Sequence, residues 1–337
     1  MSALSILSEW KKNQFKNIYW LEGEEDFYID EVMEYAEKNI LTKEHAEFNL
    51  SIFYGKDANW ADLINSCRRY PMFADKQVVL LKEAQQMKDI ERLESYVEKP
   101  LASTILVVSY KGKTLDGRSK LAKSIKKHGE VFVSKKIYDN QLPAWTNGYL
   151  QSKGFEINSR ALLLLVDHVG NDLNRIANEV EKLAMNLGAE KKITEDHIER
   201  YIGVSKEYNI FELQHALSKK DLPKTLKIIQ YFEANPKAAP VQLILPSLYN
   251  YFSKIMVIYQ MSDKSERALR PLFFNNPSLV QQAIDTLMNY SYSEAEQVIL
   301  LLHDYNLKSV GINSNNMGVG SLLKELTYKI INTGSWN

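Results

Sequence analysis

The sequence has 337 residues, enough for two or three domains, and its 45% hydrophobic and 25% charged residues are typical of a soluble globular protein. The 42 Lys and Arg residues equal the 42 Asp and Glu residues, so no net field favours unassisted binding to nucleic acid. A lone Cys67 excludes an internal disulfide and a four-thiolate zinc site, and no apolar run reaches the roughly 20 residues that cross a bilayer. The start of the chain lacks the pattern of a secretion signal. These features predict a cytoplasmic protein that does not bind membranes.

Short β-rich runs alternate with helical patterns over the first 139 residues. The runs cover residues 18–21, 48–53, 77–81, 104–109 and 131–133. Between them, apolar residues repeat at helical spacing, as in Ile29, Met33, Ala36 and Ile40. This alternation predicts an α/β domain over residues 1–139, with a parallel sheet and flanking crossover helices.

After Asp139 the strand signal ends and the periodicity becomes helical. Residues 140–208 are predicted to form a small helical domain, with Ser159 and Thr194 as N-caps and helices near 142–152, 159–169, 172–187 and 194–201. Residues 209–337 are predicted to form a third, all-helical domain, with helices that include 223–234, 241–261, 293–308 and 321–331. Asn-Pro pairs at 235–236 and 276–277 are expected to break helices, and the stretch 311–320 is the candidate mobile loop.

The first predicted strand runs into Gly23-Glu24-Glu25-Asp26-Phe27-Tyr28-Ile29-Asp30, where a nucleotide-binding α/β domain would carry its phosphate loop. Such a loop needs glycines, a Lys for charge and a Ser or Thr for magnesium. Tyr28, Ile29 and Asp30 replace the Gly, Lys and Ser/Thr, and three acidic residues precede them. These acids suit a helix N-terminus, so we expect no nucleotide cofactor.

Other signatures of chemistry are weak. The fragment Gly112-Lys113-Thr114 matches the tail of a phosphate loop, but residue 107 is Val where the leading glycine would stand, so a plain turn is expected. The six histidines lack metal-ligand spacing, and no hydrolase or Cys/His signature occurs. We therefore expect no catalytic residue, no bound metal and no intrinsic enzyme activity.

A local basic face is predicted between Lys111 and Lys136, where nine Lys or Arg residues stand against two acidic ones. Its helix carries Leu121, Ala122 and Ile125 on one side and, on the other, Lys120, Lys123, Lys126 and Lys127. A solvated face is the commoner meaning of such a charge run. The alternative is a contact with DNA phosphates or with an acidic partner.

Large apolar side chains occupy the short connection Tyr70-Pro71-Met72-Phe73-Ala74, between a predicted helix and the strand at 77–81. They are either tucked under the sheet or presented to a partner. Because most Met and Phe residues are buried in folded proteins, the residue types alone favour the core.

Several stretches together resemble the bacterial clamp-loader delta family in order and spacing. These stretches are 18–27, Pro71-Met72-Phe73 before Val78-Val79-Leu80, 116–121, 170–173 with 178–183, and 210–213. The resemblance implies an AAA+-type α/β domain with a degenerate phosphate loop, a helical lid domain and a helical collar domain for oligomerisation. An apolar stripe in 241–261 is expected to contact partner subunits, with Leu243, Leu248, Tyr251, Phe252, Ile255 and Ile258.

The resemblance also implies a function and partners. The chain would be a non-ATPase subunit of the DNA polymerase III assembly that binds and opens the sliding clamp (the beta subunit), so that the clamp is loaded on primed DNA. Its other partners would be the ATPase subunits (tau/gamma), delta prime and primed DNA within the complex. Pro71, Met72 and Phe73 would form the clamp-binding wedge, where Met72 departs from the small aliphatic or aromatic residue common in the family. Ser66-Cys67-Arg68 has the wrong order for the arginine-finger motif of the ATPase subunits.

Two other classes of protein stay open on the sequence. A degenerate nucleotide-binding protein would be stabilised by a nucleotide in a thermal titration. A helical scaffold unrelated to replication would show no binding to the clamp.

Overall fold

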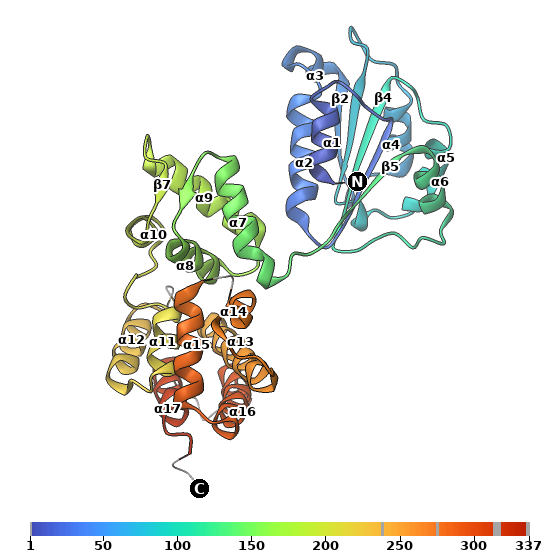
Figure 1. The fold of residues 1–337 in the computed structure, drawn as a ribbon. Helices are drawn as coiled ribbons and strands as arrows, with labels where there is room; N and C mark the ends of the chain where they lie inside the picture. Colours follow the sequence, from blue (N-terminus) through green and yellow to red (C-terminus); the bar gives the residue numbers. More distant parts are fainter. Residues whose placement is uncertain (1, 237–238, 274–275, 313–317, 335–337) are drawn as a thin grey trace. The chain divides into compact units, whose positions relative to one another are not determined.

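The computed structural model describes the chain except for residues 1, 237–238, 274–275, 313–317 and 335–337 (Figure 1). Its contacts divide it into two compact units, Met1–Ile137 and Tyr138–Asn337. The second and third predicted domains lie together in the second unit, and the boundary between them at residues 208 and 209 stays a prediction. None of the helices in the described part of the chain combines the length and apolar character that a membrane span needs.

A five-stranded parallel sheet forms the centre of the first unit. Its strands follow the spatial order β2-β3-β4-β1-β5, and each neighbouring pair is parallel. The strands are β1 (Ile18–Gly23), β2 (Leu50–Tyr54), β3 (Gln77–Lys82), β4 (Thr104–Lys111) and β5 (Glu130–Ser134). All five predicted strands are therefore confirmed, although Phe48 lies in the helix before β2 and not in the strand.

Helices cover both faces of this sheet (Figure 1). One face packs against α1 (Ala3–Trp10) and α2 (Asp26–Asn39), and the other against α4 (Trp60–Cys67), α5 (Glu94–Val97) and α6 (Lys120–His128). The remaining helices of this unit are α3 (Lys43–Asn49), η1 (Ala84–Gln86) and η2 (Ile90–Leu93). The central strands are buried on both faces, as parallel strands between helical layers must be. The predicted fold class is confirmed in its architecture, since a parallel sheet with flanking helices is followed by a mainly helical part of the chain.

The first part of the second unit is helical with one short strand pair. Its elements are η3 (Asp139–Gln141), α7 (Leu142–Ser152), β6 (Glu156–Ile157), α8 (Ser159–Val169), α9 (Leu173–Leu187), β7 (Lys192–Ile193) and α10 (Glu195–Ile202). The expectation that strands end at Asp139 was wrong, because β6 and β7 pair in parallel. The N-cap of α8 is Asn158, whose Oδ1 accepts from the N–H of Ala161 at 2.8 Å, and not the predicted Ser159. Thr194 is the N-cap of α10, as predicted.

Longer helices build the rest of the second unit. They are α11 (Ile210–Ser218), α12 (Leu222–Ala234), α13 (Val241–Gln260), α14 (Glu266–Leu269), η4 (Arg270–Phe273), α15 (Pro277–Asn289), α16 (Tyr292–Ser309) and α17 (Val319–Ile331). The second Asn-Pro pair begins a helix, because Asn276 caps α15 and Pro277 takes its first position, where no N–H is needed. The candidate mobile loop at 311–320 falls mainly on 313–317, outside the described residues.

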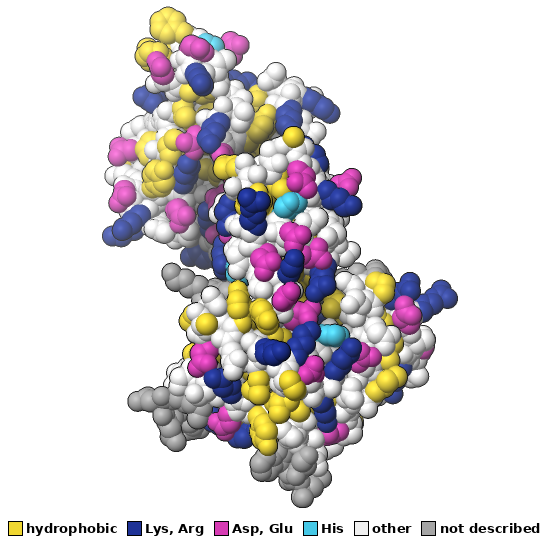
Figure 2. Space-filling view, turned by 90° about the vertical axis from the view of Figure 1, so that its left-hand side faces the viewer, with side chains coloured by type: hydrophobic (Ala, Val, Ile, Leu, Met, Phe, Trp, Pro, Cys, Tyr) yellow, Lys and Arg dark blue, Asp and Glu magenta, His cyan; other side chains and the backbone are white. Residues whose placement is uncertain are grey.

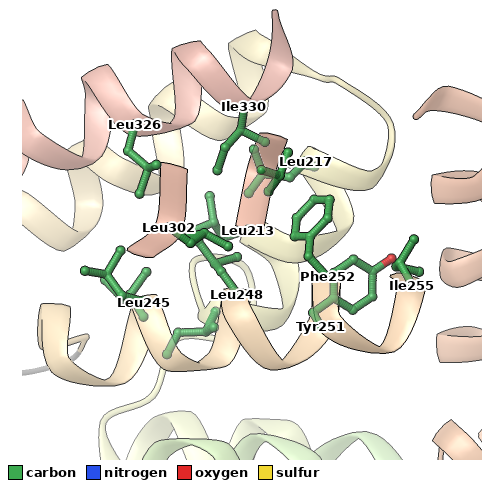
Figure 3. Packing of buried hydrophobic residues seen from close by; sticks show 14 of the residues in the cluster. Leu213, Leu217, Leu245, Leu248, Tyr251, Phe252, Ile255, Leu302, Leu326 and Ile330 are labelled. Atoms are coloured by element: carbon green, nitrogen blue, oxygen red, sulfur yellow. The ribbon is translucent and has the colours of Figure 1, made fainter. Parts of the chain in front are cut away.

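The apolar stripe of α13 lies in the core of this helical region and does not face partner subunits. Leu248, Phe252 and Ile255 lie in one buried cluster with Leu217 of α11, Leu302 of α16 and Ile330 of α17 (Figure 3). Tyr251 is buried in the same cluster, and its hydroxyl donates to the carbonyl oxygen of Gln282 in α15 at 3.2 Å. Ile258 is also buried there, and Leu243 is partly buried. The expected partner contact through this stripe was wrong, because helices of the same chain cover it. The exposed apolar residues of α13 are Tyr249 and Val257 instead.

Candidate partner-binding site

The connection between α4 and β3 presents its large apolar side chains to solvent. The exposed fraction is 77% for Tyr70, 53% for Met72 and 90% for Phe73. Figure 2 shows hydrophobic side chains at the upper tip of the α/β unit, beside charged ones. The interpretation of Met72 and Phe73 as core residues was therefore wrong, because the turn carries both side chains away from the sheet. Apolar groups this exposed are available to a partner.

The backbone at Phe73 is held in an unfavourable conformation. Its φ angle is +55°, in the left-handed region, where the Cβ of an L-residue crowds the backbone. Such a conformation costs on the order of 1 kcal/mol for a residue other than Gly, and it persists only where the surroundings impose it. The turn must therefore be fixed by contacts that the exposed side chains do not provide.

A buried amide, Asn49, provides these contacts. Asn49 is the last residue of α3 and is 3% exposed. Its Oδ1 accepts from the N–H of Met72 at 2.7 Å, and its Nδ2 donates to the carbonyl oxygen of Met72 at 2.9 Å and to that of His45 at 3.0 Å. The side chain thus pairs with both backbone polar groups of Met72, directly before Phe73. Asn49 was not predicted from the sequence, since no local pattern relates it to a turn 23 residues later.

A second buried amide, Gln77, fixes the other end of the connection. Its Nε2 donates to the carbonyl oxygen of Arg69 at 2.6 Å and to Oγ1 of Thr104 at 2.7 Å. Thr104 in turn donates to the carbonyl oxygen of Cys67 at 2.8 Å. Burial raises the pKa of the Cys67 thiol to about 12, so this side chain is a neutral packing group at the end of α4. Tyr70 to Phe73 therefore project from two anchored backbone positions.

The loop between β1 and α2 lies where a nucleotide-binding domain carries its phosphate loop. Its first two backbone N–H groups form hydrogen bonds within the protein. The N–H of Gly23 donates to the carbonyl oxygen of Lys113 at 3.2 Å, and the N–H of Glu24 donates to that of Ser134 at 3.0 Å. Ser134 Oγ also donates to the carbonyl oxygen of Glu25 at 2.7 Å. A phosphate loop offers free N–H groups to its ligand, and here the first two are used within the protein.

Sterics and charge at this loop also oppose a phosphate. Gly23 has a φ of +127°, and a Cβ there would lie 2.0 Å from the carbonyl oxygen of Ser134, so the chain has no free space at this point. Asp30 forms an ion pair with Lys111 at 2.6 Å. Burial raises the pKa of the Asp26 carboxyl, although Lys111 opposes that shift. The predicted plain turn at Gly112-Lys113-Thr114 is a bend at Gly112, with a φ of +73°, followed by a short antiparallel bridge between Lys113 and Gly23. The N–H of Gly112 donates to the carbonyl oxygen of Gly23 at 2.8 Å.

The predicted basic face is present on α6. Ser119 caps the helix by accepting from the N–H of Ala122 at 3.1 Å, and Leu121 and Ile125 are buried against the sheet. The exposed side of α6 carries Lys120, Lys123, Lys126 and Lys127. Within the described part of the chain, none of the four forms an ion pair. A contact of this face with DNA or a partner stays a prediction. The described residues also hold no group of three or more His, Cys, Asp or Glu side chains that could bind a metal.

Comparisons with known proteins show which proteins this chain is similar to. Residues 19–135 match the family model described as DNA polymerase III, delta subunit. The DNA polymerase III subunit delta of Bacillus subtilis (strain 168) is 25% identical over 321 residues, which cover 91% of this chain and 92% of the relative. A probable DNA polymerase III subunit delta of Aquifex aeolicus (strain VF5) is 24% identical over 303 residues, which cover 85% of this chain and 84% of that protein.

One solved structure shows the same fold over nearly the whole chain. The Bacillus subtilis DNA clamp loader delta protein is similar with a TM-score of 0.56 and 21% sequence identity, over 98% of this chain and 99% of that one. The resemblance to the delta family that the sequence motifs indicated is thereby confirmed.

Proposed function

We propose that this chain, a relative of the DNA polymerase III delta subunits, binds a sliding clamp through Pro71, Met72 and Phe73 and opens it for loading on primed DNA in the cytoplasm. The observation that carries this proposal is the exposure of Phe73 on a constrained backbone. Its side chain is 90% exposed and its φ angle is +55°. The buried amide of Asn49 fixes the backbone of Met72 directly before it. Exposing a large aromatic ring on a constrained backbone is unfavourable for the free protein. It is favourable for a protein that inserts that ring into a partner.

The chemistry of the turn suits an apolar pocket. A few large apolar or aromatic anchors typically dominate a protein interface, and fixing them in the free protein reduces the entropy lost on binding. Pro71 restricts φ at the start of the turn, and Asn49 fixes Met72. Phe73 is thus the main anchor in this proposal, with Met72 as an adaptable second contact.

Opening of the clamp follows from binding only if the turn binds the open form better than the closed form. A constrained turn suits this role, because it cannot relax to fit a closed interface without breaking the Asn49 contacts. The proposed contribution of the chain is therefore differential binding and not chemistry. In the same proposal the chain neither binds nor hydrolyses ATP. The bonded N–H groups of Gly23 and Glu24, and the acidic residues Glu24 and Glu25 between β1 and α2, support this part of the proposal.

Assembly into the loader is assigned to residues 209–337, as the collar domain that joins the ATPase subunits (tau/gamma) and delta prime. The buried stripe of α13 does not support this assignment, which rests on the relation to the delta family. A chain ending at Tyr208 should keep clamp binding and lose the loader complex. Co-purification of that shortened chain with the ATPase subunits would contradict the assignment. The basic face of α6 is the candidate contact with primed DNA within the complex.

The decisive experiment is a titration of the full chain with the sliding clamp of the same organism, by calorimetry or surface plasmon resonance, without ATP. The proposal expects a saturable complex whose formation does not depend on nucleotide. The absence of binding at clamp concentrations up to tens of micromolar would contradict it and would favour an unrelated helical scaffold. Micromolar binding of ATP in the same calorimeter would instead favour a degenerate nucleotide-binding protein.

A further inference from the structure

We infer that Asn49 is a positioning residue for the clamp-binding turn, holding Phe73 in the left-handed conformation in which its ring is presented to the clamp. This inference rests on the proposed function of the turn, and it assigns a role to a residue outside the turn itself. Asn49 lies at the junction of α3 and β2, on a different segment from the residues that it positions.

The geometry favours positioning over simple packing. The amide of Asn49 meets both the N–H and the carbonyl oxygen of Met72, at 2.7 and 2.9 Å, in the way that a neighbouring strand would. Two bonds to one residue fix both the place and the orientation of its peptide groups. The peptide group after Met72 is also the one that precedes Phe73, so fixing its orientation fixes one side of the φ torsion at Phe73.

The other contacts of Asn49 make it a rigid support. Its Nδ2 also donates to the carbonyl oxygen of His45 at 3.0 Å, which links the amide to α3. With 3% of Asn49 exposed, water cannot readily replace these bonds. The exposed apolar side chains of the turn contribute little to holding its shape, since Phe73 is 90% exposed. Removing the amide should therefore free the turn while the sheet behind it keeps its own hydrogen bonds.

The test is a double-mutant cycle on clamp affinity with Asn49→Ala and Phe73→Ala, singly and together, in the full chain. Asn49→Ala alone should weaken clamp binding by about tenfold, because the turn must then be ordered on binding. In the Phe73→Ala background the same change should alter affinity by less than about twofold, because the anchor that Asn49 positions is already gone. A merely structural role of Asn49 would give the same loss in both backgrounds.

A second readout follows the turn in the free protein. Chymotrypsin cleaves after aromatic residues in mobile segments, so cleavage after Phe73 should be faster in Asn49→Ala than in the unchanged chain. Tyr70 offers no such site, because Pro71 follows it. Should Asn49→Ala fail to fold, Asn49→Asp takes its place. This variant keeps an oxygen for the N–H of Met72 but sets a carboxylate oxygen against two carbonyl oxygens, so it should show the same direction in both measurements.

The matched control is Ser119→Ala, which removes a side-chain bond to a backbone N–H at the start of α6 in the same unit. It should leave clamp affinity and cleavage of the turn unchanged. An unchanged affinity in Phe73→Ala would overturn the proposed function itself. A loss in Phe73→Ala with none in Asn49→Ala, equal losses in both backgrounds, or cleavage of the turn at the unchanged rate would each overturn only the positioning role of Asn49.

Discussion

Two connections in the α/β unit, the loop between β1 and α2 and the turn between α4 and β3, have opposite characters. In the loop, the N–H groups of Gly23 and Glu24 are bonded to Lys113 and Ser134, so the backbone is closed to a ligand. In the turn, the backbone is fixed just as firmly, by Asn49, but the side chains of Met72 and Phe73 face solvent. A fixed backbone thus leaves no free N–H groups for a ligand at Gly23 and Glu24, whereas in the turn it holds the side chains of Met72 and Phe73 in solvent.

The two connections also lie at opposite ends of the sheet. A parallel sheet of this kind places a loop after its first strand where a phosphate would bind, and here that loop is closed and acidic. The turn before β3 lies at the opposite ends of the strands, because the strands are parallel and the turn enters β3 while the loop leaves β1. In our proposal, the domain keeps the sheet as a scaffold and uses the opposite ends of the strands for contact with a partner.

The largest expected effect of a single change concerns the closed loop. Gly23→Ala should lower the free energy of unfolding by about 3 kcal/mol or more, because the φ of +127° is unfavourable for Ala and the new Cβ meets the carbonyl oxygen of Ser134. Urea unfolding followed by circular dichroism measures this loss. The protein that stays folded should bind the clamp normally. A stability equal to that of the unchanged chain would show that the loop is open.

A smaller loss is expected from Ser134→Ala, on the strand that closes the loop. The change removes the bond from Ser134 Oγ to the carbonyl oxygen of Glu25 in a buried place, and it should cost about 1.5 kcal/mol of unfolding free energy. The same unfolding assay applies. If Ser134→Ala acquired micromolar affinity for ATP in calorimetry, closure by this strand would be what excludes the nucleotide, and the acidic residues would matter less than argued above.

A still smaller effect is expected from Met72→Ala in the turn. Met72→Ala should weaken clamp binding by about fivefold, or about 1 kcal/mol, because the side chain is only half exposed and Met adapts readily to its surroundings. Surface plasmon resonance with immobilised clamp resolves such a difference. A loss larger than that of Phe73→Ala would make Met72 the main anchor and would reverse the assignment within the turn.

The sequence predicted the sheet well because each strand is a short run of β-forming residues between helical patterns. The central strands β1, β3 and β4 are buried on both faces, so their runs are almost wholly apolar. The sequence also predicted that the loop after β1 lacks the groups for a phosphate, since Tyr28, Ile29 and Asp30 are visible in the chain itself. The stripe of α13 was assigned to partners wrongly, because an apolar face looks the same whether it meets another subunit or α11, α16 and α17.

The turn was predicted only in part, for a physical reason. Residue types favoured burial of Met72 and Phe73, and only the resemblance to a family suggested exposure. The φ angle of Phe73 and the two hydrogen bonds from Asn49 to Met72 decide between burial and exposure. Both are properties of the folded chain. Contacts between residues 23 positions apart leave no periodic signal to read.

The most direct test of the account measures clamp affinity and melting temperature side by side for Phe73→Ala. We expect binding to weaken by about thirtyfold or more, or roughly 2 kcal/mol, while the melting temperature stays unchanged, because a ring that is 90% exposed contributes little to the fold. A sharp fall in melting temperature, with normal clamp binding by the protein that remains folded, would contradict the account and return Phe73 to the core.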